Sequence, residues 1–309
     1  MRVVVSEFMD ETALTNFGDG YTVNYDPGLV DNPARLLEAL SDADAIIVRN
    51  RTLVNVEFLN AAPKLKVVGR LGVGLDNIDL DACKERGVEV CPAVGANTLS
   101  VVEYVIGTAM ALTRTAYASN DAMIAGEWPR GVLGNGGEVS GRTIGLFGFG
   151  GIAQAVAKHA ISFGMSVAAF DPYLPKDHPA WEGIKNCTTD ELLGLADILS
   201  LHVPLTKETA DMIDAVAISK MKSGAVLINT ARGGIVDENA VVAALKSGKL
   251  GGAALDVFAA EPLTAEAGAK FSDTPNLILT PHIAGVTFEG NTRVSFVTVE
   301  NVMHVLNGG

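Results

Sequence analysis

The sequence predicts an α/β protein with two doubly wound domains, each built around a parallel sheet. Short β-branched runs alternate with amphipathic helical patterns along the chain, which is typical of βαβ units. The 309 residues exceed one small domain, and 48% of them are hydrophobic, enough for two substantial cores. The alternation is interrupted once, by a long apolar helical stretch that begins at Thr98. This interruption separates a first series of elements from a second.

The first series fills roughly the first ninety residues. Its strands are predicted at Arg2–Ser6, Ala45–Val48, Leu65–Gly69 and Val88–Cys91. Its helices are predicted at Pro33–Leu40, Asn55–Ala61 and Asp79–Arg86. Each of these helical patterns has Asp, Asn or Pro near its start, as helix N-termini prefer. We therefore expect a first α/β domain that ends in ordered structure near Asn97.

The second series follows the long helix, which is predicted from Thr98 to about Ala118, and a Gly-rich loop at Gly131–Gly137. Its strands are predicted at Thr143–Gly148, Ser166–Asp171, Ile198–His202, Ala225–Asn229, Gly252–Asp256 and Leu277–Thr280. A last helix, Gly290–Leu306, could return to the first domain. We therefore predict one domain at residues 1–97 plus 286–309 and another at residues 98–285.

Composition and charge argue against several classes of protein. The net charge of −13 disfavours general affinity for nucleic acid or anionic membranes. The longest apolar stretch, Val101–Leu112, is too short to cross a bilayer, and the N-terminus lacks a signal-peptide layout. The three cysteines are Cys83, Cys91 and Cys187. They form no C-x-x-C pair or metal-type cluster, so we expect reduced thiols in a cytoplasmic protein and no metal site.

Residues 143–171 contain a dinucleotide-binding fingerprint. A strand runs into Gly148-Phe149-Gly150-Gly151-Ile152-Ala153, a helix follows, and the next strand ends at Asp171, 23 residues after Gly148. Gly148 would make the tight turn, and Gly150 would let the backbone and the helix N-terminus approach the pyrophosphate. Asp171 would accept hydrogen bonds from the ribose hydroxyls and repel a 2′-phosphate, which favours NAD over NADP. The alternative is a plain structural turn, with Asp171 capping the bend before Pro172.

Three segments each place a chemically useful side chain just after a predicted strand: Arg232, Glu261 and His282. Ligands collect beyond the carboxyl ends of an open parallel sheet, so these side chains can meet. An arginine fork can hold a carboxylate, and a histidine oriented by a carboxylate can take a hydroxyl proton as hydride leaves. Taken singly, each residue also fits an ordinary structural role. Together with a dinucleotide fold, they predict hydride transfer on a hydroxy acid.

Over essentially the whole chain, the sequence resembles the D-isomer-specific 2-hydroxyacid dehydrogenase family, in its phosphoglycerate-dehydrogenase-like branch. The segments that carry the resemblance are Gly69–Asp79 (GRLGVGLDNID), His202–Thr209 (HVPLTKET), Met221–Glu238 (MKSGAVLINTARGGIVDE), Gly252–Phe258 (GAALDVF), Glu261–Leu263 and Pro281–Gly285 (PHIAG). The resemblance implies two Rossmann-like domains flanking a cleft, NAD as cofactor, and a homodimer built by the helix after Asn97.

The resemblance also implies a role for each site residue. Arg232 would bind the substrate carboxylate or keto oxygen, His282 would be the acid/base, and Glu261 would support His282. Asp256 would bind the nicotinamide carboxamide, and backbone amides around Val73 and Gly74 would meet the substrate carboxylate. The residues expected to line the cofactor are Gly148, Gly150, Gly151, Ile152, Asp171, Val203, Pro204, Thr209, Thr230, Ala231, Asp256 and Gly285.

Two features depart from the family pattern. Gly151 stands where many relatives carry a longer side chain, so no side-chain contact with the pyrophosphate is expected there. The sequence ends at Gly309, which leaves no room for the C-terminal regulatory domains of some phosphoglycerate dehydrogenases. Feedback control by serine through such a domain is therefore not expected.

The loop Arg49-Asn50-Arg51-Thr52 bears on the identity of the substrate. In phosphoglycerate dehydrogenases the matching loop begins with an arginine that holds the substrate phosphate. Arg49 falls on that position and Arg51 adds a second cation, which suggests a second anionic group on the substrate. The alternative is a solvated surface pair whose aliphatic stems pack on the protein.

Three segments most resemble the sulfolactate dehydrogenase members of the family: Ser6–Glu11, the loop at 49–52 and Gly126–Arg130. Because the sulfonate sulfur outranks the carboxyl group in naming, a D-configured sulfolactate is called S. We therefore rank (S)-3-sulfolactate first, 3-phosphoglycerate second, and a small monoanionic acid such as D-lactate, glycerate or glyoxylate third. Two further classes stay open. One is an NAD-sensing corepressor without turnover; the other is formate dehydrogenase, which usually has Gln where Glu261 is expected.

Overall fold

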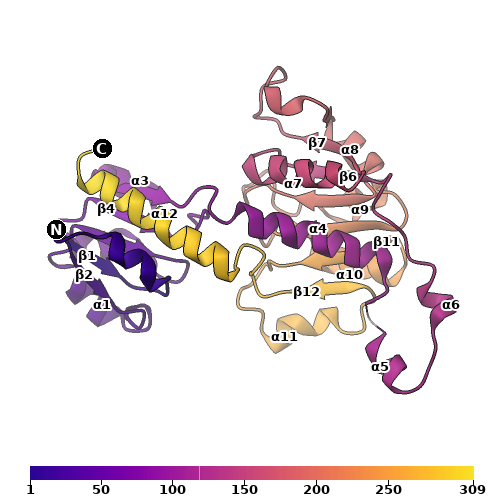
Figure 1. Ribbon diagram of the computed structural model, residues 1–309, viewed down its shortest axis with the longest axis horizontal. Helices are drawn as coiled ribbons and strands as arrows, with labels where there is room; N and C mark the ends of the chain where they lie inside the picture. The colour runs from indigo at the N-terminus through magenta and orange to yellow at the C-terminus, as the bar shows by residue number, and fades with distance from the viewer. Residues whose placement is uncertain (118) are drawn as a thin grey trace. The chain divides into compact units, whose positions relative to one another are not determined.

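The computed structural model describes residues 1–117 and 119–309, and the chain divides into two compact units (Figure 1). The N-terminal unit comprises Met1–Asn97 and Val286–Gly309, and the central unit comprises Thr98–Gly285. The end predicted for the long helix, Ala118, lies outside the described residues. None of the described helices is long and apolar enough to cross a membrane.

The N-terminal unit contains a five-stranded parallel sheet in the order β2-β1-β3-β4-β5. Its strands are β1 (Arg2–Val5), β2 (Thr22–Tyr25), β3 (Ala45–Val48), β4 (Val67–Arg70) and β5 (Glu89–Pro92). The chain reverses its direction of winding once, between β1 and β3. This is the strand order of flavodoxin-like doubly wound sheets, whose ligands bind beyond the strand ends at that reversal.

Helices cover both faces of this sheet. One face carries α1 (Pro33–Leu40), α2 (Val56–Ala61) and α3 (Leu80–Glu85), and the short η2 (Leu29–Asp31) precedes α1. The other face carries η1 (Glu11–Asn16) and α12 (Phe288–Leu306), which lies along β4 (Figure 1). Gly69 permits this approach, because a Cβ at that position would stand 2.5 Å from the Val302 side chain. The last helix therefore completes the core of the N-terminal unit.

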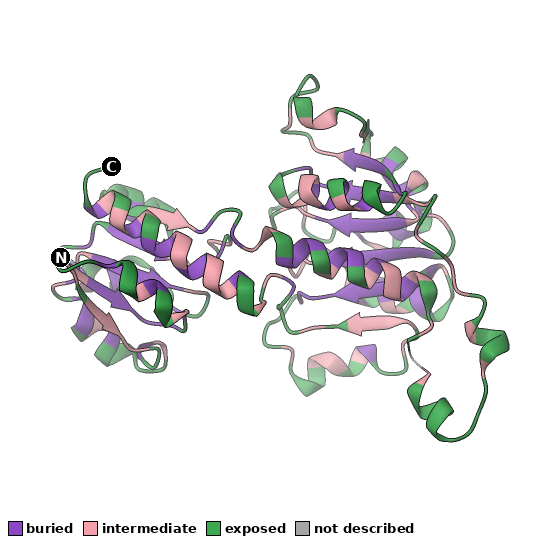
Figure 2. Cartoon of the chain, viewed as in Figure 1, coloured by how far each residue is buried: buried purple, intermediate pink, exposed green. Residues whose placement is uncertain are grey.

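The central unit contains a seven-stranded parallel sheet in the order β12-β11-β10-β9-β6-β7-β8. Its strands are β6 (Thr143–Phe147), β7 (Ser166–Phe170), β8 (Lys185–Asn186), β9 (Ile198–Leu201), β10 (Ala225–Asn229), β11 (Leu250–Leu255) and β12 (Leu277–Leu279). The inner strands are buried on both faces (Figure 2). The winding reverses between β6 and β9, so the switch point of this sheet lies at the ends of those two strands.

The helices of the central unit fall on two faces of the sheet. On one face α4 packs against α7, and on the other lie α8, α9 and α10. Their bounds, with those of the remaining helices, are α4 (Thr98–Arg114), α5 (Asn120–Ile124), α6 (Arg130–Leu133), α7 (Gly151–Ser162), η3 (Pro179–Trp181), α8 (Thr189–Leu195), α9 (Ala215–Lys220), α10 (Glu238–Lys246), α11 (Ala265–Gly268) and η4 (Ala269–Phe271). The predicted fold class, two doubly wound parallel-sheet domains, is confirmed.

The structure differs from the prediction at the periphery. The sequence did not predict β2, a half-exposed strand at the sheet edge, or β8, which has only two residues. The loop predicted at Gly131–Gly137 overlaps the single helical turn of α6. All residues of α5 and α6 are described, and none of them is buried (Figure 2). Their sequences therefore lack the apolar periodicity from which a helix can be predicted.

Candidate active site

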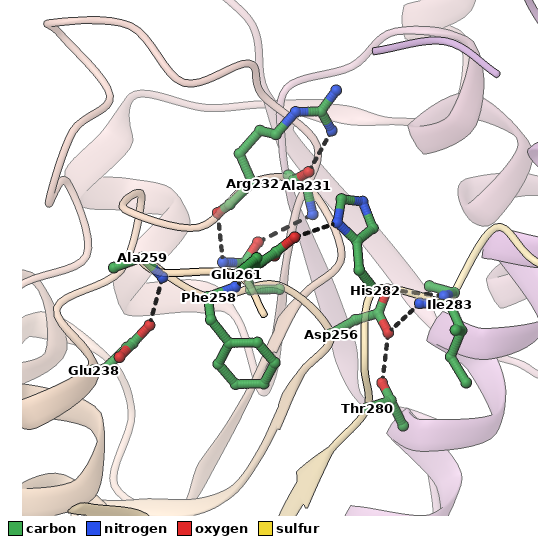
Figure 3. A network of polar contacts seen from close by, with 12 residues as sticks. Ala231, Arg232, Glu238, Asp256, Phe258, Ala259, Glu261, Thr280, His282 and Ile283 are labelled. Atoms are coloured by element: carbon green, nitrogen blue, oxygen red, sulfur yellow. Dashed lines mark hydrogen bonds and ion pairs between the residues drawn. The ribbon is translucent and has the colours of Figure 1, made fainter. Parts of the chain in front are cut away.

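Three neighbouring strands of the central sheet, β10, β11 and β12, end beside one another. The loops that follow them carry Arg232, Glu261 and His282, and Figure 3 shows all three around one network of polar contacts. His282 Nδ1 lies 2.8 Å from Glu261 Oε2. With the imidazole assigned as donor to the carboxylate, the proton of the neutral ring is on Nδ1, which leaves Nε2 as a base. Both side chains are partly exposed, His282 by 46% and Glu261 by 35%.

Backbone contacts hold the loop that carries Glu261. The other oxygen of its carboxylate, Oε1, accepts the Phe258 N–H at 2.9 Å. The Ala259 N–H donates to Glu238 Oε1 at 2.8 Å, and the second oxygen of Glu238 pairs with Lys270. Glu238 is buried at the start of α10, so the loop is fastened to that helix (Figure 3). As a result, one oxygen of Glu261 is fixed by the backbone while the other meets the imidazole.

The turn at Arg232 is shaped by Asn229 at the end of β10. The Asn229 side chain donates to the Arg232 carbonyl at 3.0 Å and accepts the Ala231 N–H at 3.1 Å. Gly233 brings this turn against the Glu261 loop, since a Cβ there would stand 1.7 Å from the Phe258 carbonyl oxygen. The Arg232 guanidinium donates to the Ala231 carbonyl at 2.6 Å and points to the same side of the network as the His282 ring (Figure 3).

His282 itself adopts a left-handed backbone conformation, with φ of 56°. A non-glycine residue in this region costs about 1–3 kcal/mol and needs support from its surroundings. The support comes from Asp256, whose side chain is buried at the end of β11. The Asp256 carbonyl accepts the His282 N–H at 2.7 Å, and the carboxylate accepts the N–H groups of Ile283 and Ala284, each at 2.8 Å. Sequence reasoning missed this role, because the contacts join two separate loops.

The glycine-rich loop forms an open cradle at the switch point of the sheet. Gly148 has φ of 85°, and a Cβ there would stand 2.5 Å from the His202 carbonyl oxygen at the end of β9. At Gly150 and Gly151, apart from the neighbouring residues and the backbone of the helix itself, no atom of the described residues lies within 4 Å of where a Cβ would be. The helix α7 begins at Gly151 and Ile152, and its first-turn N–H groups have no intrahelical acceptor. Bare backbone amides at a helix start suit the pyrophosphate of a dinucleotide.

Asp171 lies at the end of β7 and organises two loops. One oxygen accepts the Phe149 N–H at 2.8 Å, and the other accepts the N–H groups of Tyr173 and Leu174 at 2.8 and 3.1 Å. The turn-capping role considered for this residue is therefore present in the structure. The bond to Phe149 also holds the carboxylate beside the glycine-rich loop, where the ribose of a dinucleotide would lie.

Two further loops border the cradle. After β9, the Thr209 hydroxyl donates to the Pro204 carbonyl at 2.7 Å, while Val203 packs on the core. After β10, Thr230 Oγ1 is buried and has no hydrogen-bond partner among the described residues. A buried hydroxyl without a partner is costly unless a ligand supplies one. This orphaned oxygen and the open glycine cradle fit a bound dinucleotide. Among the residues that the structure describes, no group of three or more His, Cys, Asp or Glu side chains is placed to hold a metal ion.

The predicted substrate residues Arg49 and Arg51 lie in the N-terminal unit, in a loop built around Glu7. The buried Glu7 carboxylate accepts N–H groups from four consecutive residues, 49 to 52, at 2.8 to 3.3 Å. Burial opposes ionisation, but the bonds from Thr52, Arg49 and Arg51 together lower the pKa of Glu7. The loop borders a pocket of about 380 Å³ that includes Asn291.

The two arginines of this loop have different partners. Arg49 donates to Asn291 Oδ1 at 2.8 Å and to the Phe8 carbonyl at 3.4 Å. Arg51 forms an exposed ion pair with Asp31. Sequence reasoning did not identify Glu7, Asp31 or Asn291, because each meets the loop from a distant part of the chain. After β4, Val73 is exposed and Gly74 is half-buried.

A dinucleotide cradle beside a histidine–carboxylate pair defines a class of protein. One half of such a site accepts hydride and the other accepts a proton, so the central unit is that of a nucleotide-dependent dehydrogenase. The family profile described as D-isomer specific 2-hydroxyacid dehydrogenase, NAD binding domain, matches residues 106–284. The chain belongs to this family and is an NAD-dependent oxidoreductase. The predicted family, enzyme class and cofactor are confirmed.

Individual relatives extend over nearly the whole chain. It is 52% identical over 305 residues to (S)-sulfolactate dehydrogenase of Chromohalobacter salexigens, covering 98% of both chains. It is 39% identical over 308 residues to D-3-phosphoglycerate dehydrogenase of Mycobacterium leprae, covering 99% of this chain and 57% of that protein. Among solved structures, D-lactate dehydrogenase of Aquifex aeolicus, complexed with NAD and lactic acid, gives a TM-score of 0.84 at 30% identity, covering 100% of this chain and 96% of that one.

Proposed function

We propose that this protein interconverts (S)-3-sulfolactate and its 2-oxo acid with NAD. The 2.8 Å contact between His282 and Glu261 is the observation that supports hydroxy-acid oxidation, because it orients a proton acceptor for the substrate hydroxyl beside the cofactor cradle. The substrate assignment is supported by the 52% identity to a (S)-sulfolactate dehydrogenase. It is supported further by the cationic loop of the N-terminal unit.

In the proposed mechanism, each residue of the catalytic set has one task. Arg232 binds the substrate carboxylate or the reacting oxygen through its guanidinium fork. His282 takes the proton of the C2 hydroxyl at Nε2, and Glu261 stabilises the resulting imidazolium through Nδ1. NAD supplies the acceptor for the hydride that leaves C2. In the reverse direction His282 returns the proton to the oxo oxygen.

The residues proposed to hold NAD surround the glycine cradle. The amides at Gly150, Gly151 and Ile152 would bind the pyrophosphate, and Asp171 would bind the ribose hydroxyls. The remaining cofactor residues in the proposal are Gly148, Val203, Pro204, Thr209, Thr230, Ala231, Asp256 and Gly285. Asp256 has about one acceptor position left for the nicotinamide carboxamide, since three protein donors already occupy it.

The second anionic group of the substrate is assigned to Arg49. Its guanidinium has neutral hydrogen-bond partners, Asn291 and the Phe8 carbonyl, and interacts with the Glu7 carboxylate only through charge, whereas Arg51 forms a direct ion pair with Asp31. Sulfonate and phosphate are both tetrahedral anions that a guanidinium binds well. The amides at Val73 and Gly74 are assigned to the substrate carboxylate, as the family resemblance implies.

We also propose that the protein is a homodimer. The segment around α5 and α6 exposes Tyr117, Ile124, Trp128 and Val132, whose exposed fractions range from 71% to 85%. Exposed apolar side chains gathered in one segment mark an interface, and a second copy of the chain is the proposed occupant, joined also through α4. A cytoplasmic location is proposed because the three cysteines are free thiols. Burial and the nearby Glu89 raise the pKa of the Cys91 thiol to about 11.

The test is a substrate panel followed by NADH absorbance: (S)-3-sulfolactate, 3-phosphoglycerate, D-lactate, D-glycerate and formate. We expect the highest kcat/KM with sulfolactate. In the variant Arg49→Ala, we expect about a 10- to 100-fold loss with sulfolactate and a much smaller loss with D-lactate, because a bond to a charged group is removed. Equal losses for both substrates would show that the loop is only structural.

The second candidate substrate is 3-phosphoglycerate, favoured by the 39% identity to D-3-phosphoglycerate dehydrogenase and by the same cationic loop. Monoanionic acids such as D-lactate and glycerate rank third. Turnover of formate alone would identify a formate dehydrogenase. No turnover with any substrate, together with measurable NADH binding, would favour the corepressor-like alternative. A sedimentation or light-scattering mass of one chain would refute the homodimer.

A further inference from the structure

The polar network at His282 continues beyond Asp256 into the helix α4. Thr280 follows β12, and its hydroxyl donates to Asp256 Oδ1 at 2.6 Å. The hydroxyl of Tyr104, in the middle of α4, lies 2.6 Å from the same Thr280 oxygen. All three residues belong to the central unit. The mechanism proposed above uses neither Tyr104 nor Thr280.

The direction of each bond follows from the number of protons available. A hydroxyl has one proton to donate, and that of Thr280 goes to the carboxylate. Tyr104 must therefore donate to Thr280, which leaves an ordered chain from Tyr104 through Thr280 to Asp256. Donation from Tyr104 strengthens the next bond, because linked hydrogen bonds polarise one another.

The chain ends where the catalytic loop begins. The same oxygen that accepts the Thr280 hydroxyl also accepts the Ile283 N–H, and the other oxygen accepts the Ala284 N–H. These amides follow His282 directly, whose own φ of 56° is an unfavourable conformation that must be held by its neighbours. Anything that rotates the Asp256 carboxylate therefore changes the support of the His282 backbone.

We propose that Tyr104 and Thr280 are positioning residues for His282: they orient the Asp256 carboxylate so that it holds the loop after the catalytic histidine. This inference rests on the proposed role of His282. It extends the site to a helix on which no residue touches the reacting groups in the proposed mechanism. The Tyr104 ring packs against the buried core cluster between α4, α7 and the sheet, so its hydroxyl is presented from a rigid support.

The experiment compares Thr280→Val with Thr280→Ser in the full-length enzyme. Valine matches the shape of threonine but cannot donate, whereas serine keeps the hydroxyl. For Thr280→Val we expect kcat to fall about 10-fold, because a hydrogen bond to a charged group is lost. Thr280→Ser should recover most of the activity. In Tyr104→Phe we expect kcat to fall about 3-fold. The control Tyr21→Phe removes a hydroxyl bonded to Asn307 in the N-terminal unit, and its kcat should equal that of the wild type.

Two readouts separate positioning from general destabilisation. With substrate deuterated at C2, the isotope effect on kcat should rise in Thr280→Val, because a misplaced base slows the chemical step. Amide hydrogen exchange in the peptide spanning residues 281–286 should accelerate in the same variant, since Ile283 and Ala284 lose their fixed acceptor. An unchanged isotope effect with equal activity loss in Val and Ser variants would overturn the proposal.

The exchange measurement also distinguishes this inference from the proposed function. If the wild-type protein turns over no 2-hydroxy acid, the proposed function fails, yet exchange at 281–286 still reports whether Thr280 holds the loop. If the protein is active but Thr280→Val exchanges like wild type, the inference fails and the proposed function stands. Thermal unfolding of each variant verifies that the comparison is made on folded protein.

Discussion

Replacing Glu261 by glutamine tests the pair at the centre of the site. Glutamine keeps the length of the side chain, and its carbonyl oxygen can still accept the Phe258 N–H. What changes is the group that faces His282 Nδ1, which becomes a neutral amide that can donate a proton. The ring is then pushed toward the tautomer with its proton on Nε2, which cannot accept the substrate proton. The charge that stabilises the imidazolium is also lost.

The size of the effect follows from the geometry of the pair. Two unit charges about 4 Å apart interact by about 1 kcal/mol in water and about 4 kcal/mol at an effective dielectric of 20. The side chains are 46% and 35% exposed, so screening places the pair between these limits, at about 2 kcal/mol. Because about 1.4 kcal/mol corresponds to a factor of ten, kcat/KM for hydroxy-acid oxidation should fall about 30-fold.

The assay is the initial rate of NADH formation over a range of substrate concentrations. The matched control is Glu266→Gln, which makes the same chemical change on an exposed residue of the same unit. We expect normal kinetics in the control and a loss confined largely to kcat in Glu261→Gln. Less than 3-fold loss, or an equal loss in the control, would refute the role assigned to the His282–Glu261 pair.

Three further predictions concern other parts of the chain. Asp171→Asn should raise the Kd for NAD about 10-fold and reduce the ratio by which NAD binds more tightly than NADP, because it removes a hydrogen-bond acceptor and a negative charge. An unchanged ratio of the two Kd values in fluorescence titrations would contradict this. Gly233→Ala should lower kcat/KM at least about 100-fold, because its Cβ would stand 1.7 Å from the Phe258 carbonyl oxygen; normal kinetics would refute the close approach of the two loops. Glu7→Gln should lower the free energy of unfolding at neutral pH by about 2 kcal/mol. Since the folded-state pKa of Glu7 lies below its ordinary value of 4.5, this difference should persist above that pH and shrink as the pH falls through the lowered value. A pH-independent difference in urea unfolding would contradict it.

The strands of both sheets were predictable because buried parallel strands are continuous β-branched runs. Ala45–Val48 and Ala225–Asn229 have the same bounds in prediction and structure, and both are fully buried. The edge strand β2 was missed because its half-exposed residues lack that signal, and it is recognisable only through its pairing with β1. Edge elements depend on their neighbours more than on their own composition.

The grouping of Arg232, Glu261 and His282 was predictable for a different reason. Parallel strands deliver their following loops to one edge, so residues after β10, β11 and β12 gather there without any knowledge of side-chain geometry. What sequence could not supply was the set of contacts that support them. Asp256 meets Thr280 across two loops, and Glu7 meets a loop more than forty residues away. Such bonds depend on three-dimensional closeness, which no local pattern encodes.

The way Glu7 holds the loop at residues 49–52 has a consequence for how substrate preference can evolve. The main-chain amides of the loop are bound to one carboxylate, and the side chains of Arg49 and Arg51 contribute none of these bonds. Residues 49 and 51 can therefore be exchanged by mutation while the path of the backbone is retained. If residues 49 and 51 contact the substrate as proposed, a lineage can change the charge that faces a new acid by single substitutions, without rebuilding the loop.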